Sequence, residues 1–219
     1  MRTETIHNLT LINTDCMEYM KGCKDNEFDL AIVDPPYNIA SQQKRGVGSR
    51  IDPTGKMNTW NHKTRDPEYF LELFRVSRNQ VTWGANNYVL PPTEYFCIWN
   101  KKQTVDNFAT AEYAWVSMGL KTPAKVFDYS IHQHNSDHAG GYKIHPTQKP
   151  IPLYDWLLTN YAEKGQKILD THGGSFSSAI AAHYFGCEYV GIEIDKDYFE
   201  AGVVRVKEQT KQIDLFRQG

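Results

Sequence analysis

Residues 167–195 read KILDTHGGSFSSAIAAHYFGCEYVGIEID, and this stretch decides the fold. It predicts a short apolar strand over 167–170, a turn of small residues, a helix over 177–185 that Gly186 ends, and a second strand over 189–195 that finishes in an acid. This order indicates a nucleotide-binding βαβ unit. Its glycines admit a ligand close to the backbone, and its terminal acid accepts hydrogen bonds from ribose hydroxyls.

The turn of this unit excludes two kinds of phosphate site. It lacks the Gly-Lys-Ser or Gly-Lys-Thr of a Walker phosphate loop, and the dinucleotide pattern G-x-G-x-x-G is incomplete. The expected ligand is therefore a nucleoside without a pyrophosphate.

A second informative feature is the tetrapeptide Asp34-Pro35-Pro36-Tyr37, which follows an apolar run over 28–33 that predicts a buried strand. A carboxylate at the tip of such a strand lies at the carboxyl edge of a sheet, where open α/β folds place their active sites. The two prolines stop the strand and stiffen the turn. A carboxylate, free carbonyls and an aromatic side chain suit a planar ring with an exocyclic amine.

A third segment, 145–150, reads His-Pro-Thr-Gln-Lys-Pro and precedes a predicted helix over 151–162. Together the three segments resemble the S-adenosylmethionine-dependent amino-methyltransferases of DNA. In the β-class of that family the catalytic tetrapeptide comes first, then His-Pro-Thr-Gln-Lys-Pro, then the glycine loop, and this chain has the same order. The resemblance runs from about residue 9 to residue 207.

The resemblance implies an α/β fold, a Rossmann-like class I methyltransferase. In that fold, helices cover both faces of a seven-stranded, mostly parallel sheet with one antiparallel strand. A single domain is expected over residues 1–219, with a helix beginning at Asp66-Pro67. The patterns of apolar residues predict further strands over 9–14, 80–83, 95–99, 111–116 and 124–129.

The resemblance also implies the reaction, a methyl transfer from S-adenosylmethionine to an exocyclic amine of a flipped base in DNA. The catalytic residues would be Asp34, Pro35, Pro36 and Tyr37, with Asp34 and the Pro35 carbonyl accepting hydrogen bonds from the amine. Aspartate at the first position favours the N6 amine of adenine in this family. The N4 amine of cytosine, adenine in RNA, and a non-catalytic nucleic-acid-binding partner of the same fold remain alternatives. Carbon-5 methylation is excluded, because it needs a Pro-Cys pair and the chain has none.

The same resemblance implies a set of cofactor-binding residues. Asp15 would face the adenine, Glu193 would accept the ribose hydroxyls, and Thr147 and Lys149 would lie at the cofactor's carboxylate. The full set is Asp15, Cys16, Asp34, His145, Thr147, Lys149, Asp170, His172, Gly173, Ser175, Glu193 and Asp195.

The glycine loop departs from the family pattern Asp-Pro-Phe-x-Gly-Ser-Gly-Thr. Thr171 and His172 replace the Pro-Phe pair, and Phe176 replaces the second glycine. A phenylalanine takes a positive φ only at a cost, so the resemblance does not fix the shape of this loop. His172 is either a cofactor neighbour or a surface residue.

Three further segments carry expectations about partners. Residues 38–66 form a long, basic loop that would contact DNA phosphates through Lys44, Arg45, Arg50, Lys56, Lys63 and Arg65. Residues 130–143 would be a short target-recognition region, and its three histidines do not have the spacing of a metal site. So small a chain with so short a region favours a homodimer on double-stranded DNA.

The tail over 212–219 contains Gln212-Ile213-Asp214-Leu215-Phe216, which resembles the short peptide that binds the bacterial sliding clamp. The alternative is that Leu215 and Phe216 pack back onto the domain.

Composition fits one globular enzyme of 219 residues with a net charge of −2. The four cysteines have no C-x-x-C spacing, which favours reduced thiols and no metal. No apolar run reaches membrane-spanning length, and the first residues lack an apolar signal region. We therefore expect a cytoplasmic protein of prokaryotic or phage type, associated with the nucleoid through DNA.

Overall fold

The structure is a computed structural model, and it describes residues 1–36, 67–104, 106, 109–131 and 143–211. One nine-stranded sheet runs through it in the order β1-β2-β9-β8-β3-β4-β6-β5-β7. The strands are β1 (Arg2–Ile6), β2 (Leu9–Asn13), β3 (Phe28–Val33), β4 (Ser77–Trp83), β5 (Phe96–Asn100), β6 (Ala111–Val116), β7 (Lys125–Asp128), β8 (Lys167–Asp170) and β9 (Glu188–Glu193). The helices are α1 (Cys16–Lys21), α3 (Pro67–Val76), α5 (Ile151–Tyr161), α6 (Ser177–Phe185) and α7 (Lys196–Thr210), with short 3-10 turns η1 (Ala85–Asn87) and η2 (Met118–Leu120).

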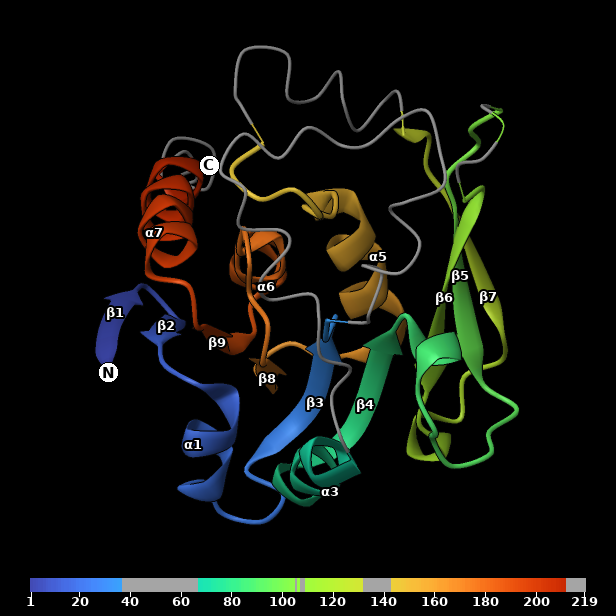
Figure 1. Ribbon diagram of the computed structural model, residues 1–219, viewed down its shortest axis with the longest axis horizontal. Helices are drawn as coiled ribbons and strands as arrows, with labels where there is room; N and C mark the ends of the chain where they lie inside the picture. Colours follow the sequence, from blue (N-terminus) through green and yellow to red (C-terminus); the bar gives the residue numbers. More distant parts are fainter. Residues whose placement is uncertain (37–66, 105, 107–108, 132–142, 212–219) are drawn as a thin grey trace.

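The helices lie on both faces of the sheet. In Figure 1, α1 and α3 cover one face, and α5, α6 and α7 cover the other. Each face has its own apolar cluster, with Phe28, Leu73 and Ile192 in the first and Leu157, Phe199 and Val203 in the second. No helix of the described residues is long and apolar enough to cross a membrane.

The predicted α/β class is confirmed, but the expected strand count is wrong. The sheet has nine strands instead of seven, and β1 and β6 both run antiparallel to their neighbours. The strand missing from the sequence prediction is β1, which pairs with β2 through a two-residue turn at His7 and Asn8. As an edge strand it buries only Ile6, so it lacks the apolar alternation that marks an interior strand.

The βαβ unit folds as its sequence predicts. Strand β8, helix α6 and strand β9 follow one another, and Gly186 ends α6 in the left-handed conformation with φ 88°. The first six residues of α6 are all buried, because serine and alanine side chains let the helix pack closely. The strict parallel pairing of β8 and β9 then brings their carboxyl ends together.

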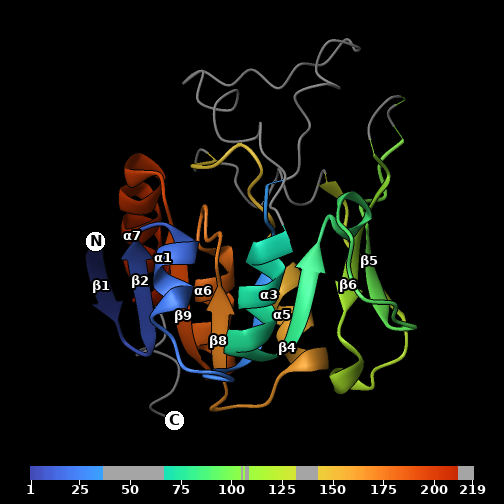
Figure 2. The same cartoon turned by 60° about the horizontal axis from the view of Figure 1, so that its bottom comes forward.

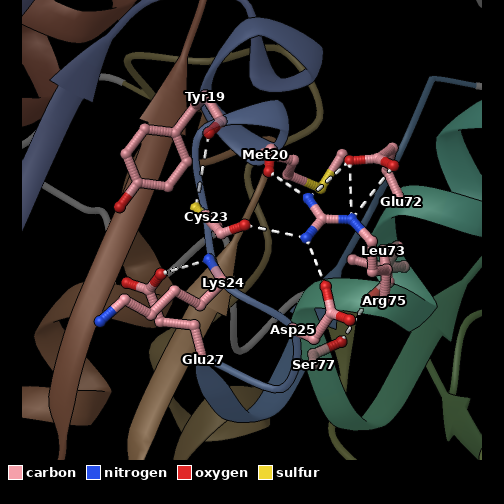
Figure 3. A network of polar contacts seen from close by, with 10 residues as sticks. All are labelled: Tyr19, Met20, Cys23, Lys24, Asp25, Glu27, Glu72, Leu73, Arg75 and Ser77. Atoms are coloured by element: carbon pink, nitrogen blue, oxygen red, sulfur yellow. Dashed lines mark hydrogen bonds and ion pairs between the residues drawn. The ribbon is translucent and has the colours of Figure 1, made fainter.

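A network of polar contacts joins α1 to α3 on the face away from α6 (Figure 3). The Arg75 guanidinium donates to the carbonyl oxygens of Met20 (2.7 Å) and Cys23 (2.8 Å), at the end of α1. It also pairs with Asp25 and Glu72, each at 2.8 Å. These carboxylates raise the pKa of Arg75, so the charge that satisfies the helix end is permanent.

Replacing Arg75 by methionine is expected to lower the melting temperature, because the Cys23 carbonyl loses its Arg75 donor and the Met20 carbonyl is left with the Cys23 N–H. The control is Arg78→Met, since Arg78 is exposed and makes a single 3.7 Å contact with Asp29. Thermal unfolding followed by circular dichroism checks this. Equal melting temperatures for the two variants would contradict the role of Arg75 in stabilising the contact between α1 and α3.

Candidate active site

Four acids lie at the carboxyl ends of four neighbouring parallel strands. In sheet order the strands are β2, β9, β8 and β3. The acids that end or follow them are Asp15, Glu193, Asp170 and Asp34. Figure 2 shows the segment before α5, drawn in yellow, at the end of the sheet toward which the arrows of β4 and β8 point. The three segments that the sequence singles out therefore meet at one edge, where open α/β folds bind their ligands.

Glu193 holds the glycine turn against the end of β9. Its side chain accepts hydrogen bonds from the backbone N–H groups of Gly174 (2.9 Å) and Asp195 (2.8 Å). Burial raises the pKa of Glu193 to about 7, although these two N–H groups oppose the rise. Each carboxylate oxygen keeps a second lone pair, which leaves capacity for hydroxyl donors.

Asp170 organises the start of the loop. It accepts hydrogen bonds from the His172 backbone N–H (3.0 Å) and the Ser178 hydroxyl (2.6 Å), and burial raises its pKa to about 6. The His172 ring lies 2.9 Å from the Thr171 hydroxyl and 4.0 Å from the Cys16 sulfur. His172 is therefore packed between the loop and α1 at the site, which does not fit its interpretation as a surface residue.

Phe176 takes the conformation that the sequence disfavours. It is fully buried with φ 54°, in the place where the family has a glycine. Its ring fills space left by three glycines, because a Cβ at Gly173, Gly191 or Gly202 would come within 2.2, 2.9 or 2.5 Å of ring atoms. Burial of the ring against these glycines and Phe199 offsets the backbone strain.

Two of the predicted cofactor residues cap helices. Asp15 accepts from the backbone N–H of Met17 (2.7 Å) at the start of α1, and Asp195 accepts from that of Asp197 (2.9 Å) at the start of α7. These caps fix both side chains at the carboxyl edge of the sheet. Their contact with a cofactor remains a prediction.

His145 and Thr147 lie over the glycine turn. The Nδ1 of His145 accepts from the Thr147 backbone N–H (3.3 Å), and its ring packs edge-on against Tyr198 with centroids 4.5 Å apart. Burial, with a further contribution from Lys149, lowers the pKa of His145 to about 4, so the ring is neutral at neutral pH. A Cβ at Gly174 would lie 3.5 Å from this ring, which places the histidine directly beside the turn.

Asp34 lies at the other end of this edge, and its ion-pair partner is Lys149. The Lys149 ammonium donates to Asp34 Oδ2 and lies 3.4 Å from Glu112 Oε2. The Asp34 side chain is 17% exposed, and its Oδ1 is buried without a hydrogen-bond partner among the described residues. Burial raises the pKa of Asp34, and Lys149 opposes this effect. An unsatisfied buried acceptor is costly, so Oδ1 is suited to receive a donor from a ligand.

Sequence reasoning missed three residues around Asp34. Glu112, the second residue of β6, pairs with both Lys101 and Lys149. Burial alone would raise the pKa of Glu112, but the two lysines together lower it to about 2. Tyr88 donates its hydroxyl to the carbonyls of Pro35 (2.8 Å) and Pro36 (3.0 Å) and so orients the proline turn. Lys101 and Tyr88 follow predicted strands, which was the available signal for them, whereas Glu112 lies inside a predicted strand and had none.

Several predicted site residues lie outside the described residues. They are Tyr37, the basic side chains Lys44, Arg45, Arg50, Lys56, Lys63 and Arg65, most of the region 130–143, and the segment Gln212–Phe216. Within the described part of the chain, no group of three or more His, Cys, Asp or Glu residues could hold a metal ion. The four cysteines are free.

A sheet with acids on successive strand ends and a glycine turn between two of them defines a nucleotide-binding α/β domain. Residues 56–204 match the profile of the N6/N4 methyltransferase family, described as DNA methylase. This match covers more than half of the chain, and the protein therefore belongs to that family of DNA methylases.

Individual relatives agree with the family. The type II methyltransferase M.HinfI of Haemophilus influenzae is 22% identical over 95% of this chain and 71% of its own length. Among solved structures, the cytosine-N4-specific PvuII DNA methyltransferase has a TM-score of 0.60 at 13% identity, covering 94% of this chain and 92% of that one. The complex of M1.HpyAVI with SAM has a TM-score of 0.59 at 17% identity, covering 90% of this chain and 99% of that one. At these identities the structures are similar in fold.

Proposed function

We propose that the protein transfers a methyl group from S-adenosylmethionine to the N6 amine of adenine in double-stranded DNA. The observation that carries the proposal is the Asp34 carboxylate, whose buried Oδ1 has no partner among the described residues. It lies beside the proline turn at the same sheet edge as Glu193 and the glycine loop. A target amine and a nucleoside cofactor would therefore lie next to each other.

The residues present fit this cofactor. Glu193 offers acceptors at the end of β9, and Gly174 gives the turn a backbone conformation, φ 52°, that a residue with a side chain adopts only with strain. When bound, S-adenosylmethionine supplies an activated methyl group on a sulfonium sulfur. Because the methyl group is already activated, positioning and electrostatics can carry the transfer without a covalent intermediate.

Asp34 and the Pro35 carbonyl would act on the amine. Accepting both N–H groups favours a pyramidal nitrogen, whose lone pair is less delocalised into the ring and more nucleophilic. S-adenosylmethionine would supply the methyl group and leave as a neutral thioether, and the one proton that the amine loses would pass to the Asp34 carboxylate, which accepts its N–H, and from there to water. Tyr88 would keep the Pro35 carbonyl in place through its 2.8 Å hydrogen bond.

The choice of adenine rests on the aspartate at position 34, which favours the N6 amine in this family. The similarity to the cytosine-N4-specific PvuII enzyme keeps cytosine as the second candidate. A flipped base would stack on Tyr37, and the basic loop over 38–66 would hold the phosphates. Homodimer formation and clamp binding through Gln212–Phe216 stay predictions.

Calorimetric titration with S-adenosylmethionine, followed by transfer of its labelled methyl group to DNA or RNA, tests the proposal. Cofactor binding with label in DNA alone is expected. A non-catalytic partner would bind DNA without transferring label, and an RNA enzyme would label RNA.

Cofactor affinity is expected to fall as the pH decreases from about 8 to about 6. The ribose hydroxyls donate to the Glu193 carboxylate, and burial raises the pKa of Glu193 to about 7, so binding below this pH first has to remove a proton. Calorimetry at several pH values measures the change. Glu193→Gln should remove most of the pH dependence, and an affinity that stays constant in the wild type would contradict the ribose role of Glu193.

A further inference from the structure

Asp34 and three other charged side chains form a cluster, and they come from separate elements. Asp34 follows β3, Glu112 lies on β6, Lys101 follows β5 and Lys149 precedes α5. The Lys149 ammonium contacts Asp34 Oδ2 and Glu112 Oε2, while Lys101 pairs with Glu112 Oε1. Two partly buried carboxylates therefore share one ammonium, and a second ammonium pairs with Glu112.

The Lys149 ammonium binds Oδ2 of Asp34, so only Oδ1 is available to accept a hydrogen bond from a ligand. An ammonium bound to a carboxylate makes that carboxylate a weaker hydrogen-bond acceptor. The target amine requires a strong acceptor. The Lys149 side chain is only 6% exposed, so it cannot leave Asp34 for water. A buried charge without a partner is strongly unfavourable, and Glu112 is a second carboxylate that already contacts Lys149.

We propose that Glu112 is a positioning residue that draws the Lys149 ammonium away from Asp34 when the target amine binds. Both oxygens of Asp34 then become acceptors, and Lys149 remains paired throughout. Lys101 pairs with the other oxygen of Glu112 and holds that carboxylate in position during the exchange. The inference rests on the proposed function, because Asp34 has to be the acceptor of the amine.

The charges around Asp34 set the direction of each test. Lys149 and Lys101 lower the pKa of Asp34, and Glu112 raises it. Asp170 on β8 and Tyr154 on α5 also interact with Asp34, and neither is altered in the variants below. Removing the Glu112 charge should therefore lower the pKa of Asp34, and removing the Lys101 charge should raise it.

The experiment measures kcat/KM for DNA against pH in the wild type, Glu112→Gln and Lys101→Met, with S-adenosylmethionine saturating at every pH so that protonation of Glu193 does not enter the profile. Activity should decrease as the pH falls through the pKa of Asp34, since the carboxylate is the active form. The acidic limb should move down in Glu112→Gln and up in Lys101→Met, each by about one pH unit. Glu112→Gln should also lower kcat about tenfold, because Lys149 then lacks the second carboxylate that would draw it away from Asp34. The matched control is Glu188→Gln, because Glu188 is an exposed glutamate at the amino end of β9, away from the sheet edge that carries the cluster.

A carbon-13 NMR titration of aspartate carboxyl groups in the free protein reports the pKa of Asp34 without DNA or cofactor. A tenfold loss of kcat in Glu112→Gln, together with opposite pKa shifts in the two variants, supports the exchange, whereas opposite shifts with an unchanged kcat overturn it. Shifts in the same direction, or none, in variants of an active enzyme overturn it and leave the proposed function standing. A wild-type protein that binds DNA and cofactor but transfers no methyl group overturns the proposed function and this inference with it.

Discussion

Replacing Asp34 by alanine is expected to abolish methyl transfer while cofactor affinity stays within a few-fold of the wild type. Asp34 would accept a hydrogen bond that strengthens as the amine becomes pyramidal, and losing an interaction of this kind lowers kcat by about a hundredfold to a thousandfold. Its buried Oδ1 has no partner among the described residues, so no neighbouring side chain already fills the role. Single-turnover kinetics with saturating cofactor measure the loss.

Two further variants make this result interpretable. Asp34→Asn keeps the shape and one acceptor oxygen, so it should lose less activity than alanine. Asp128 is an exposed aspartate on the edge strand β7 and pairs with Lys102, so Asp128→Ala should leave turnover unchanged. Near wild-type turnover by Asp34→Ala, in protein that melts like the wild type, would contradict the catalytic assignment.

The second large effect is expected at the cofactor. Glu193→Ala should weaken binding of S-adenosylmethionine by about 1.5 to 3 kcal/mol, the contribution of a hydrogen bond to a charged group. The variant loses the ribose acceptor, and it also leaves the buried Gly174 N–H without its 2.9 Å partner. Isothermal titration at pH 8 measures the affinity.

Glu188→Ala is the control for this variant, because Glu188 is exposed at the opposite end of the same strand. It should bind the cofactor like the wild type. Unchanged affinity in folded Glu193→Ala would mean that the acid at the end of β9 does not hold the ribose.

Local sequence patterns predicted much of this site because the site is built from strand ends. The runs before Asp34, Asp170 and Glu193 are buried and apolar, and a parallel sheet brings their carboxyl ends to one edge. Gly186 was recognisable as a helix end for a similarly local reason. None of these inferences needed the order of strands in the sheet.

The residues that the sequence did not reveal are those whose contacts depend on the order of strands in the sheet. Glu112 meets Lys149 because β6 lies between β4 and β5 and runs antiparallel to both, so its first residues lie at the carboxyl edge of the others. No local pattern contains that pairing. Lys149 was therefore predicted only as a cofactor residue, although its ammonium contacts Asp34.

Phe176 is a different case, in which a local rule points the wrong way. A positive φ is unfavourable for phenylalanine, yet the ring fills space left by Gly173, Gly191 and Gly202. Two of these glycines lie on other elements, β9 and α7, so the compensation is visible only after folding.

The central claim is that this DNA methylase acts on the adenine N6 amine. The most direct test incubates unmethylated DNA with the protein and S-adenosylmethionine, digests the DNA and identifies the methylated nucleoside by mass spectrometry. We predict N6-methyldeoxyadenosine in the wild-type reaction and its loss in Asp34→Ala. N4-methyldeoxycytidine as the product, or no methylated nucleoside from protein that binds both DNA and cofactor, would contradict the claim.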